Sequence, residues 1–301
     1  MTSWRLGRGR WIAAAGVIAI AMGVRAGAAQ QNSAANSDSQ SKAQKTATPT
    51  LGEILQRLQE NLDQYDSGVP SFFCDEHVVS RMVPDVHNQQ TVTDSVFRLK
   101  RTAKPDHTTI LEESREVKTV NDQPATKQEI DGPSIVRGAF EGGLAVVSLN
   151  QTSCMNYTLQ RINRNDAKAA IIIHFASVLT PENSGGCLLH ENGRGRVLID
   201  PATMQVTRME LTTPHHTIIP GDKMGYGSSG AIMGDWVLSV DYAPVVLDGK
   251  SFWMPATIAS RSTSGRGTFH PIVWTFRATY SNYHKLEVTS RILPFSEAPA
   301  P

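Results

Sequence analysis

This chain carries almost no net charge. Its 29 Lys and Arg residues nearly balance its 28 Asp and Glu residues, so the formal net charge is +1 over 301 residues. Proteins that hold nucleic acid through a large basic field need a clear excess of positive charge. We therefore expect no nucleic-acid partner.

Long hydrophobic runs are also missing. The apolar run near the N-terminus, residues 11–24, has 14 residues, whereas a helix needs about 20 apolar residues to cross a bilayer. Hydrophobic residues make up 40% of the chain and its mean hydropathy is −0.26. These values exclude a polytopic membrane protein and a fully disordered chain.

Motifs that carry nucleotide or metal chemistry are absent or lack their context. Residues 225–230 follow the pattern G-x-G-x-x-G, but no hydrophobic strand precedes them and Gly234-Asp235 interrupts any following helix. A phosphate-binding turn needs both neighbours. His215 and His216 are adjacent, so on a strand they point to opposite faces, and no His or Cys pair stands at metal-ligand spacing.

Two acidic pairs are equally uninformative about catalysis. Asp75-Glu76 and Glu112-Glu113 each place one carboxylate on either face of a strand, so neither pair forms an acid–base dyad. We therefore predict no catalytic, cofactor-binding or metal-binding residues, no cofactor, and a protein that is not an enzyme.

Cysteine is scarce. Cys74, Cys154 and Cys187 are the three cysteines of the chain, so in an oxidising compartment one pair forms and one thiol is left over. Cys154 and Cys187 lie at loop-like positions that flank residues 157–177, which favours a disulfide between them. Cys74 lies within an expected strand and packs as a small hydrophobic residue.

The N-terminus has the features of an export signal. Three arginines within residues 1–10 precede the apolar run, and small residues follow it up to Ala28 and Ala29. This arrangement is typical of a secretory signal peptide that is cleaved after export. Residues 1–29 contain four arginines and no acid, so the exported chain has 29 − 4 = 25 basic against 28 acidic residues, a net charge of −3. We expect the mature protein in the periplasm or the extracellular space.

A flexible linker and one helix follow the signal peptide. Residues 30–50 contain no aromatic and no large aliphatic residue, so they cannot bury enough surface to offset their chain entropy. Thr50 and Glu53 then have the spacing of a capping box. Apolar residues at helical spacing predict an amphipathic helix over residues 51–66, and Gly68 and Pro70 end it.

The remaining chain is predicted to form strands. The period of apolar residues changes from about 3.6 to 2, and two turn signals, Asp200-Pro201 and Asp248-Gly249, separate pairs of strands. We predict ten strands at 72–83, 92–101, 108–120, 157–164, 170–177, 195–200, 205–213, 236–247, 251–262 and 272–293. The fold class is therefore mainly β (α+β): an N-terminal helix packed on a curved antiparallel sheet or incomplete barrel of about ten strands in meander order. Residues 51–294 form a single domain, and residues 295–301 form a disordered tail.

One strand pair carries a family resemblance. It has the pattern G-x-V-x-I-D-P-x-T-x-x-V-x-R-x-E, formed by Gly195, Val197, Ile199, Asp200, Pro201, Thr203, Val206, Arg208 and Glu210. Together with residues 240–255 and 276–286, this pattern resembles the half-barrel superfamily of bacterial outer-membrane lipoprotein-sorting proteins, which includes LolA, LolB and RseB. The resemblance implies an incomplete barrel whose concave face holds acyl chains or an apolar peptide, and it transfers no ligand-binding residue.

Residues 214–234 stand out as a long loop that contains five glycines. Loops of this length inside a compact domain act as lids or binding loops, or are disordered. The candidate ligand-contacting residues of the loop are Ile218, Ile219, Met224, Tyr226, Ile232 and Met233. The segment is either a gate over the concave face or an uninvolved surface loop.

Three function classes stay open. The first is a periplasmic, non-catalytic binding protein that shelters a lipid, a lipoprotein or an apolar peptide and contacts the membrane peripherally. The second is a structural or interaction protein of the cell envelope. The third is a secreted hydrolase with His77, His174 or His284 as its base.

Overall fold

A computed structural model of the chain describes residues 49–83, 90–103, 109–125, 140, 144–160, 169–218, 232–264 and 273–287. The predicted signal peptide (1–29), nearly all of the predicted linker and the predicted C-terminal tail (295–301) lie outside these residues. No helix among the described residues is long and apolar enough to cross a membrane.

The α-helix of the described residues, α1 (Leu51–Gly68), begins at the predicted capping box. The backbone N–H of Thr50 donates to Glu53 Oε2 over 2.7 Å, and the backbone N–H of Glu53 donates to Thr50 Oγ1 over 3.3 Å. The helix continues two residues past the predicted end, because Val69 N–H still donates to Tyr65 O over 2.9 Å. The predicted helix and its cap are confirmed.

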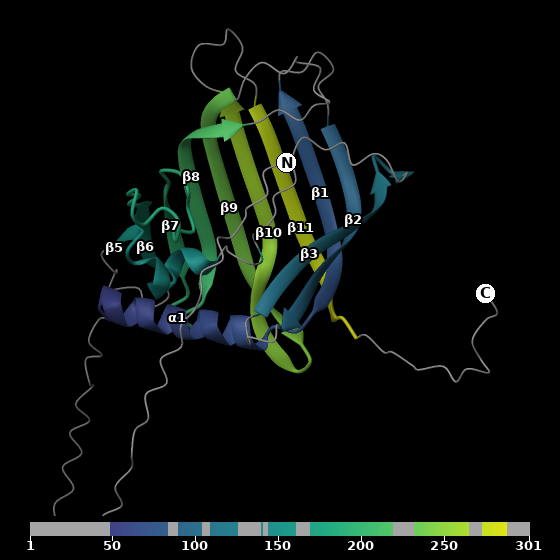
Figure 1. Ribbon diagram of the computed structural model, residues 1–301. Helices are drawn as coiled ribbons and strands as arrows, with labels where there is room; N and C mark the ends of the chain where they lie inside the picture. The colour runs from purple at the N-terminus through teal and green to yellow at the C-terminus, as the bar shows by residue number, and fades with distance from the viewer. Residues whose placement is uncertain are drawn as a thin grey trace, which may run out of the picture.

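A single antiparallel sheet forms the rest of the fold (Figure 1). Its strands are β1 (Phe72–Val83), β2 (Gln90–Ala103), β3 (Thr109–Val120), β4 (Gln123–Pro124), β5 (Met155–Leu159), β6 (Ile171–Ser177), β7 (Arg194–Ile199), β8 (Val206–Ile218), β9 (Ile232–Leu247), β10 (Lys250–Ser264) and β11 (Val273–Lys285). The sheet is curved and stays open. The predicted fold class is confirmed, with eleven strands in place of about ten. The additional strand, β4, has two residues, too few for a periodic signal.

The strand order is β4-β3-β2-β1-β11-β10-β9-β8-β7-β6-β5. The chain therefore enters the sheet in the middle, runs outward to one edge at β4, continues at the opposite edge with β5, and returns to the middle at β11. The predicted meander holds within β1–β4 and within β5–β11, but it is wrong between β4 and β5. Instead, the first and last strands pair, with Val78 opposite Ala278.

Two short 3₁₀ helices, η1 (Leu144–Val147) and η2 (Leu149–Gln151), lie between the two edge strands in sequence. They pack along α1, where Gln59 Oε1 accepts hydrogen bonds from Ser148 Oγ over 2.9 Å and from Leu149 N–H over 2.8 Å. Figure 1 shows α1 lying across one end of the sheet. The helix, η1 and η2 thus cover that end.

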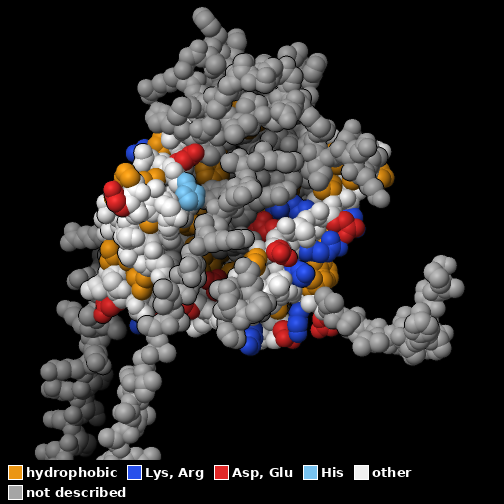
Figure 2. Space-filling model, viewed as in Figure 1, with side chains coloured by type: hydrophobic (Ala, Val, Ile, Leu, Met, Phe, Trp, Pro, Cys, Tyr) orange, Lys and Arg blue, Asp and Glu red, His pale blue; other side chains and the backbone are white. Residues whose placement is uncertain are grey.

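The inner face of the sheet carries the core. One row of buried side chains crosses seven neighbouring strands from β1 to β6 in register: Val78, Ala278, Ile258, Val240, Met209, Val197 and Ile173. The outer face carries ion pairs, such as Arg208 Nη1 with Asp241 Oδ1 at 2.7 Å. In Figure 2, positive and negative side chains lie intermixed where β2 and β3 reach the surface.

A disulfide joins Cys154 to Cys187, with Cα atoms 5.6 Å apart. Cys154 directly precedes the edge strand β5, and Cys187 lies between β6 and β7. This is the pair that the sequence favoured. Cys74 is a free and buried thiol on β1, and burial raises its pKa.

Candidate ligand-binding site

A cavity of about 390 Å³ lies between the C-terminal half of α1 and the sheet. We call it the α1 cavity. Four separate parts of the chain line it: α1, η1, the turn between β7 and β8, and the start of β10. Its volume falls within the range of about 300–1,000 Å³ that is usual for small-molecule sites.

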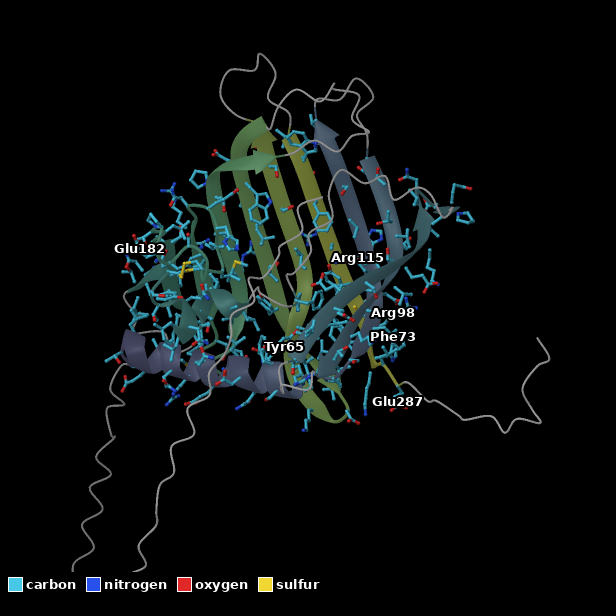
Figure 3. All side chains as sticks on the ribbon, viewed as in Figure 1. Tyr65, Phe73, Arg98, Arg115, Glu182 and Glu287 are labelled. Atoms are coloured by element: carbon cyan, nitrogen blue, oxygen red, sulfur yellow. A yellow bond between two sulfur atoms is a disulfide. The ribbon has the colours of Figure 1, made fainter. Side chains whose placement is uncertain are left out.

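The walls of the α1 cavity are apolar. Leu58, Leu62 and Tyr65 of α1 face Val206 of β8 and Phe252 and Trp253 of β10. Leu58 and Leu62 belong to the predicted apolar face of α1, so the pattern that predicts the helix also supplies part of one wall. Figure 3 labels Tyr65 where α1 meets the sheet; its hydroxyl donates to Phe140 O over 3.0 Å.

Two polar contacts and one close approach hold α1 over the cavity. Asn61 Nδ2 donates to Met204 O in the β7–β8 turn over 2.7 Å. Gly68 packs against the hairpin, since a Cβ atom at this position would lie 3.4 Å from Phe252 Cε1. Arg101 Nη1 donates to Ser67 O over 2.7 Å and to Val69 O over 3.0 Å. The last carbonyl groups of the helix are therefore satisfied by a cation.

Polar residues also line the cavity, and we call them its rim: Gln64, Ser67, Gln205, Lys250 and Ser251. Among the described lining residues, Lys250 alone is charged. The apolar walls and the polar rim together suit a ligand that is mainly apolar with one polar end.

The inner face also holds a buried polar cluster on β1, β3 and β11. Arg115 Nε donates to both carboxylate oxygens of Glu76 over 2.9 Å, and Tyr280 OH donates to Glu76 Oε1 over 2.9 Å. The side chains of Arg115 and Glu76 are 8% and 1% exposed. The guanidinium lies 4.8 Å from the ring centre of Phe97, and Figure 3 labels Arg115. This cluster joins three strands in the half of the sheet that ends at β4.

The pKa values of Tyr280 and Arg115 are both shifted upward by their surroundings. Burial and the Glu76 carboxylate raise the pKa of Tyr280 well above its usual value. Burial alone would lower the pKa of Arg115, but Glu76, Tyr280 and Glu113 raise it above its usual value. Tyr280 therefore stays neutral and Arg115 stays charged, which suits a structural or binding role better than acid–base chemistry.

Among the described residues, two inner-face hydroxyls, Ser80 Oγ and Tyr242 OH, are buried and form no hydrogen bond. Buried polar atoms without partners are rare.

The predicted ligand loop is shorter than expected. Residues 214–218 belong to β8 and residues 232–234 belong to β9, with Ile218 opposite Ile232 and Thr217 opposite Met233. Ile218, Ile232 and Met233 are therefore strand residues, which corrects their assignment to the loop. The pairing resumes after an irregularity between Thr213 and His216, which accommodates Pro214 within the ladder. Ile219, Met224 and Tyr226 lie outside the described residues, as does the glycine pattern 225–230.

The three histidines considered as catalytic bases lie apart from one another. His77 Nδ1 is 2.7 Å from Asp94 Oδ1 on the outer face, and His174 Nε2 is 3.1 Å from Gln160 Oε1. The ring of His284 stacks on Phe73 with 5.1 Å between ring centres. None of these contacts is to a nucleophilic side chain.

The acidic pair Asp75-Glu76 divides between the two faces as predicted. Glu76 is buried in the cluster with Arg115, whereas Asp75 accepts a hydrogen bond from Asn282 Nδ2 over 2.7 Å on the outside. The described residues contain no group of three or more His, Cys, Asp or Glu side chains that could hold a metal ion.

The sequence did not predict the α1 cavity. The helix and the β9–β10 hairpin were both predicted, yet no local pattern indicates that they meet. The one usable signal is Gly68 at the helix end, because the absent side chain permits close packing.

No protein-family model matches the chain, and no curated protein matches it. Among solved structures, it is similar to a LolA superfamily protein from Nitrosomonas europaea, with 12% identity and a TM-score of 0.36 over 80% of this chain and 96% of that one. A DUF1329 family protein from Desulfovibrio piger has 10% identity and a TM-score of 0.40 over 81% and 96% of the two chains.

An outer-membrane lipoprotein-sorting protein domain from Vibrio parahaemolyticus has 10% identity and a TM-score of 0.34, over 76% of this chain and 90% of that one. The proteins from Nitrosomonas and Vibrio bear the names of the group that the sequence motifs resemble. At these identities and TM-scores, none of the three matches indicates a ligand for this chain.

Proposed function

We propose that this chain is a non-catalytic binding protein that shelters an acyl chain or an apolar peptide segment. The observation that carries the proposal is the α1 cavity, whose apolar walls come from α1, β8 and β10. A lipid, a lipoprotein and an apolar peptide share the chemistry that such walls bind. Burial of a ligand there is favoured by about 25 cal/mol for each Å² of apolar surface removed from water.

The inner face extends the site beyond the cavity. Its buried row of aliphatic side chains runs from β1 to β6. An open sheet, in contrast to a closed barrel, lets a long ligand enter from the side.

We place this function outside the cytoplasm. In this proposal residues 1–29 are removed on export, residues 30–50 act as a tether, and residues 51–294 act as one domain that contacts the membrane peripherally. The disulfide between Cys154 and Cys187 supports an oxidising compartment such as the periplasm.

We propose that the segment between β8 and β9, residues 219–231, acts as a gate to the concave face. The two strands lead to the end of the sheet that lies away from α1 (Figure 1). A gate there would serve the far end of the inner face. Deletion of residues 221–231 keeps every paired strand residue, and unchanged uptake of a fluorescent fatty acid by this variant would refute the gate.

Native mass spectrometry of the protein purified from the periplasm tests the proposed function. Co-purified lipid, and displacement of a fluorescent fatty acid in solution, are the expected results. Leu62→Trp fills the α1 cavity and should weaken uptake, while Val246→Trp changes a side chain that is 68% exposed and should leave uptake unchanged.

Absence of bound lipid, together with no uptake by the wild-type protein, would contradict the proposal. A structural or interaction role in the envelope would then be favoured, unless ester or peptide substrates are turned over. Thermal unfolding of both Trp variants separates loss of binding from loss of folding.

A further inference from the structure

Lys250 brings a positive charge to the rim of the α1 cavity, and the backbone around it is held in a tight hairpin. Lys250 follows the two-residue turn Asp248-Gly249, whose φ values are 54° and 73°. Positive φ at both positions is typical of the type I′ turn that closes a tight hairpin. Lys250 pairs with Leu247 directly beside this turn, so its Cα has a fixed position at the rim.

The carboxylate nearest to Lys250 in sequence is already paired. Asp248 Oδ2 lies 2.9 Å from the Nζ atom of Lys285, the last residue of β11. Among the residues that the structure describes, no carboxylate pairs with Lys250. The side chain of Lys250 is thus free to meet an anion at the cavity.

The helix end near Lys250 does not oppose an anion strongly. The C-terminal carbonyl groups of a helix carry partial negative charge, but Arg101 donates to two of them, Ser67 O and Val69 O. The neutral rim residues Gln64 and Ser251 add hydrogen-bond donors. The described rim residues therefore carry one positive charge and no carboxylate.

We propose that the α1 cavity selects a single acyl chain with an anionic head group. The head binds Lys250 at the rim, and the chain lies between Leu62 and Trp253 in the apolar interior. This inference rests on the proposed function and adds the charge of the ligand to it. A free fatty acid and a lipid phosphate share the required chemistry.

Titration calorimetry of the full exported chain with four ten-carbon probes tests the inference: decanoate, decyl phosphate, decylammonium and 1-decanol. At low ionic strength we expect at least one of the two anions to bind about 3- to 10-fold more tightly than decanol, as one partly exposed charge contact allows. Decylammonium should bind more weakly than decanol. A preference for decanoate indicates a fatty acid, and a preference for decyl phosphate indicates a lipid phosphate.

Lys250→Gln should abolish the preference for the anion while leaving the affinity for decanol unchanged. The matched control is Lys100→Gln, an exposed lysine near the end of β2 that does not line the cavity. Extending the acyl chain by one CH₂ should raise affinity about fourfold in both proteins. Added salt should reduce the anion preference.

Two outcomes would overturn the inference and spare the proposed function. One is equal affinity of the wild-type protein for decanol and both anions, and the other is an anion preference that survives in Lys250→Gln. If none of the four probes binds, the proposed function and the inference both fail.

Discussion

The two arms of the sheet are stabilised in different ways. The arm formed by β1–β4, which meets β11, places a charged side chain pair, Glu76 and Arg115, on its inner face. The arm formed by β5–β10 has an inner face of buried aliphatic and aromatic residues, keeps its ion pairs outside, and carries the disulfide at its edge. The first arm therefore combines packing around Phe72 and Phe97 with a buried ion pair, whereas the second combines packing with a covalent link.

The largest expected effect is a loss of stability when the inner ion pair is broken, compared with an outer ion pair. Arg115→Met leaves Glu76 buried without its cation, which should lower the free energy of unfolding by about 3–5 kcal/mol. Arg196→Met removes an outer-face partner of Glu210 that is 47% exposed, and should leave stability nearly unchanged. Urea denaturation of both variants measures the difference.

Equal losses for these two variants would contradict the comparison. The double variant Glu76→Leu/Arg115→Met removes both charges of this pair and should recover part of the lost stability. Recovery is partial because Glu113, whose side chain is 6% exposed and lies 3.6 Å from Arg115, also loses its contact with this cation.

The next effect concerns the edge of the second arm. Cys154→Ala/Cys187→Ala removes the disulfide, which should cost about 2–4 kcal/mol. Thermal unfolding with and without reductant measures this loss. Reductant should lower the unfolding temperature of the wild-type protein and leave that of the double variant unchanged. If reductant does not change the unfolding temperature of the wild-type protein, the disulfide does not stabilise this edge.

A third prediction probes the packing of β7. A Cβ atom at Gly195 would lie 1.9 Å from Glu210 O and 2.5 Å from Phe175 Cζ. Gly195→Ala must push neighbouring backbone aside and should cost about 1–3 kcal/mol or more. At Gly52 in α1, where an added Cβ meets nothing within 4 Å, the same substitution should be neutral or slightly stabilising. Chemical denaturation of the two variants gives the comparison, and a neutral Gly195→Ala would refute tight packing in this arm.

The smallest effect lies in α1, which covers the end of the sheet. Although Asp66 reaches solvent, desolvation and the neighbouring Asp63 raise its pKa to about 6. A folded-state pKa above the unfolded value means that the charged form destabilises the fold, and this penalty disappears as the pH falls from about 6 to about 4.

Asp66→Asn should therefore stabilise the protein by about 0.3–1 kcal/mol at pH 7.5, since it also removes a negative charge from the last helical turn. Thermal unfolding at pH 7.5 and at pH 4.5 tests this, because the gap between variant and wild type should close at the lower pH. A gap that is constant with pH would contradict the assignment to Asp66.

Much of the fold could be predicted from local signals. The helix follows from the capping residues Thr50 and Glu53 and a periodic apolar face. The β9–β10 hairpin follows from Asp248-Gly249, because few residues other than Gly, Asn and Asp accept positive φ. The end of β8 and the start of β9 were harder to predict. Pro214 and Gly234 are typical of a loop, yet the two strands continue past them.

The sequence by itself determined one helix, a set of antiparallel strands and the absence of recognisable catalytic motifs, because these depend on periodicity and turn chemistry within a few residues. Only the tertiary structure decided that β1 pairs with β11 and that β4 and β5 form opposite edges. It also decided that residues near positions 62, 147, 206 and 250 enclose one cavity. Contacts between distant segments depend on how whole faces pack against each other, and no short stretch of sequence encodes them.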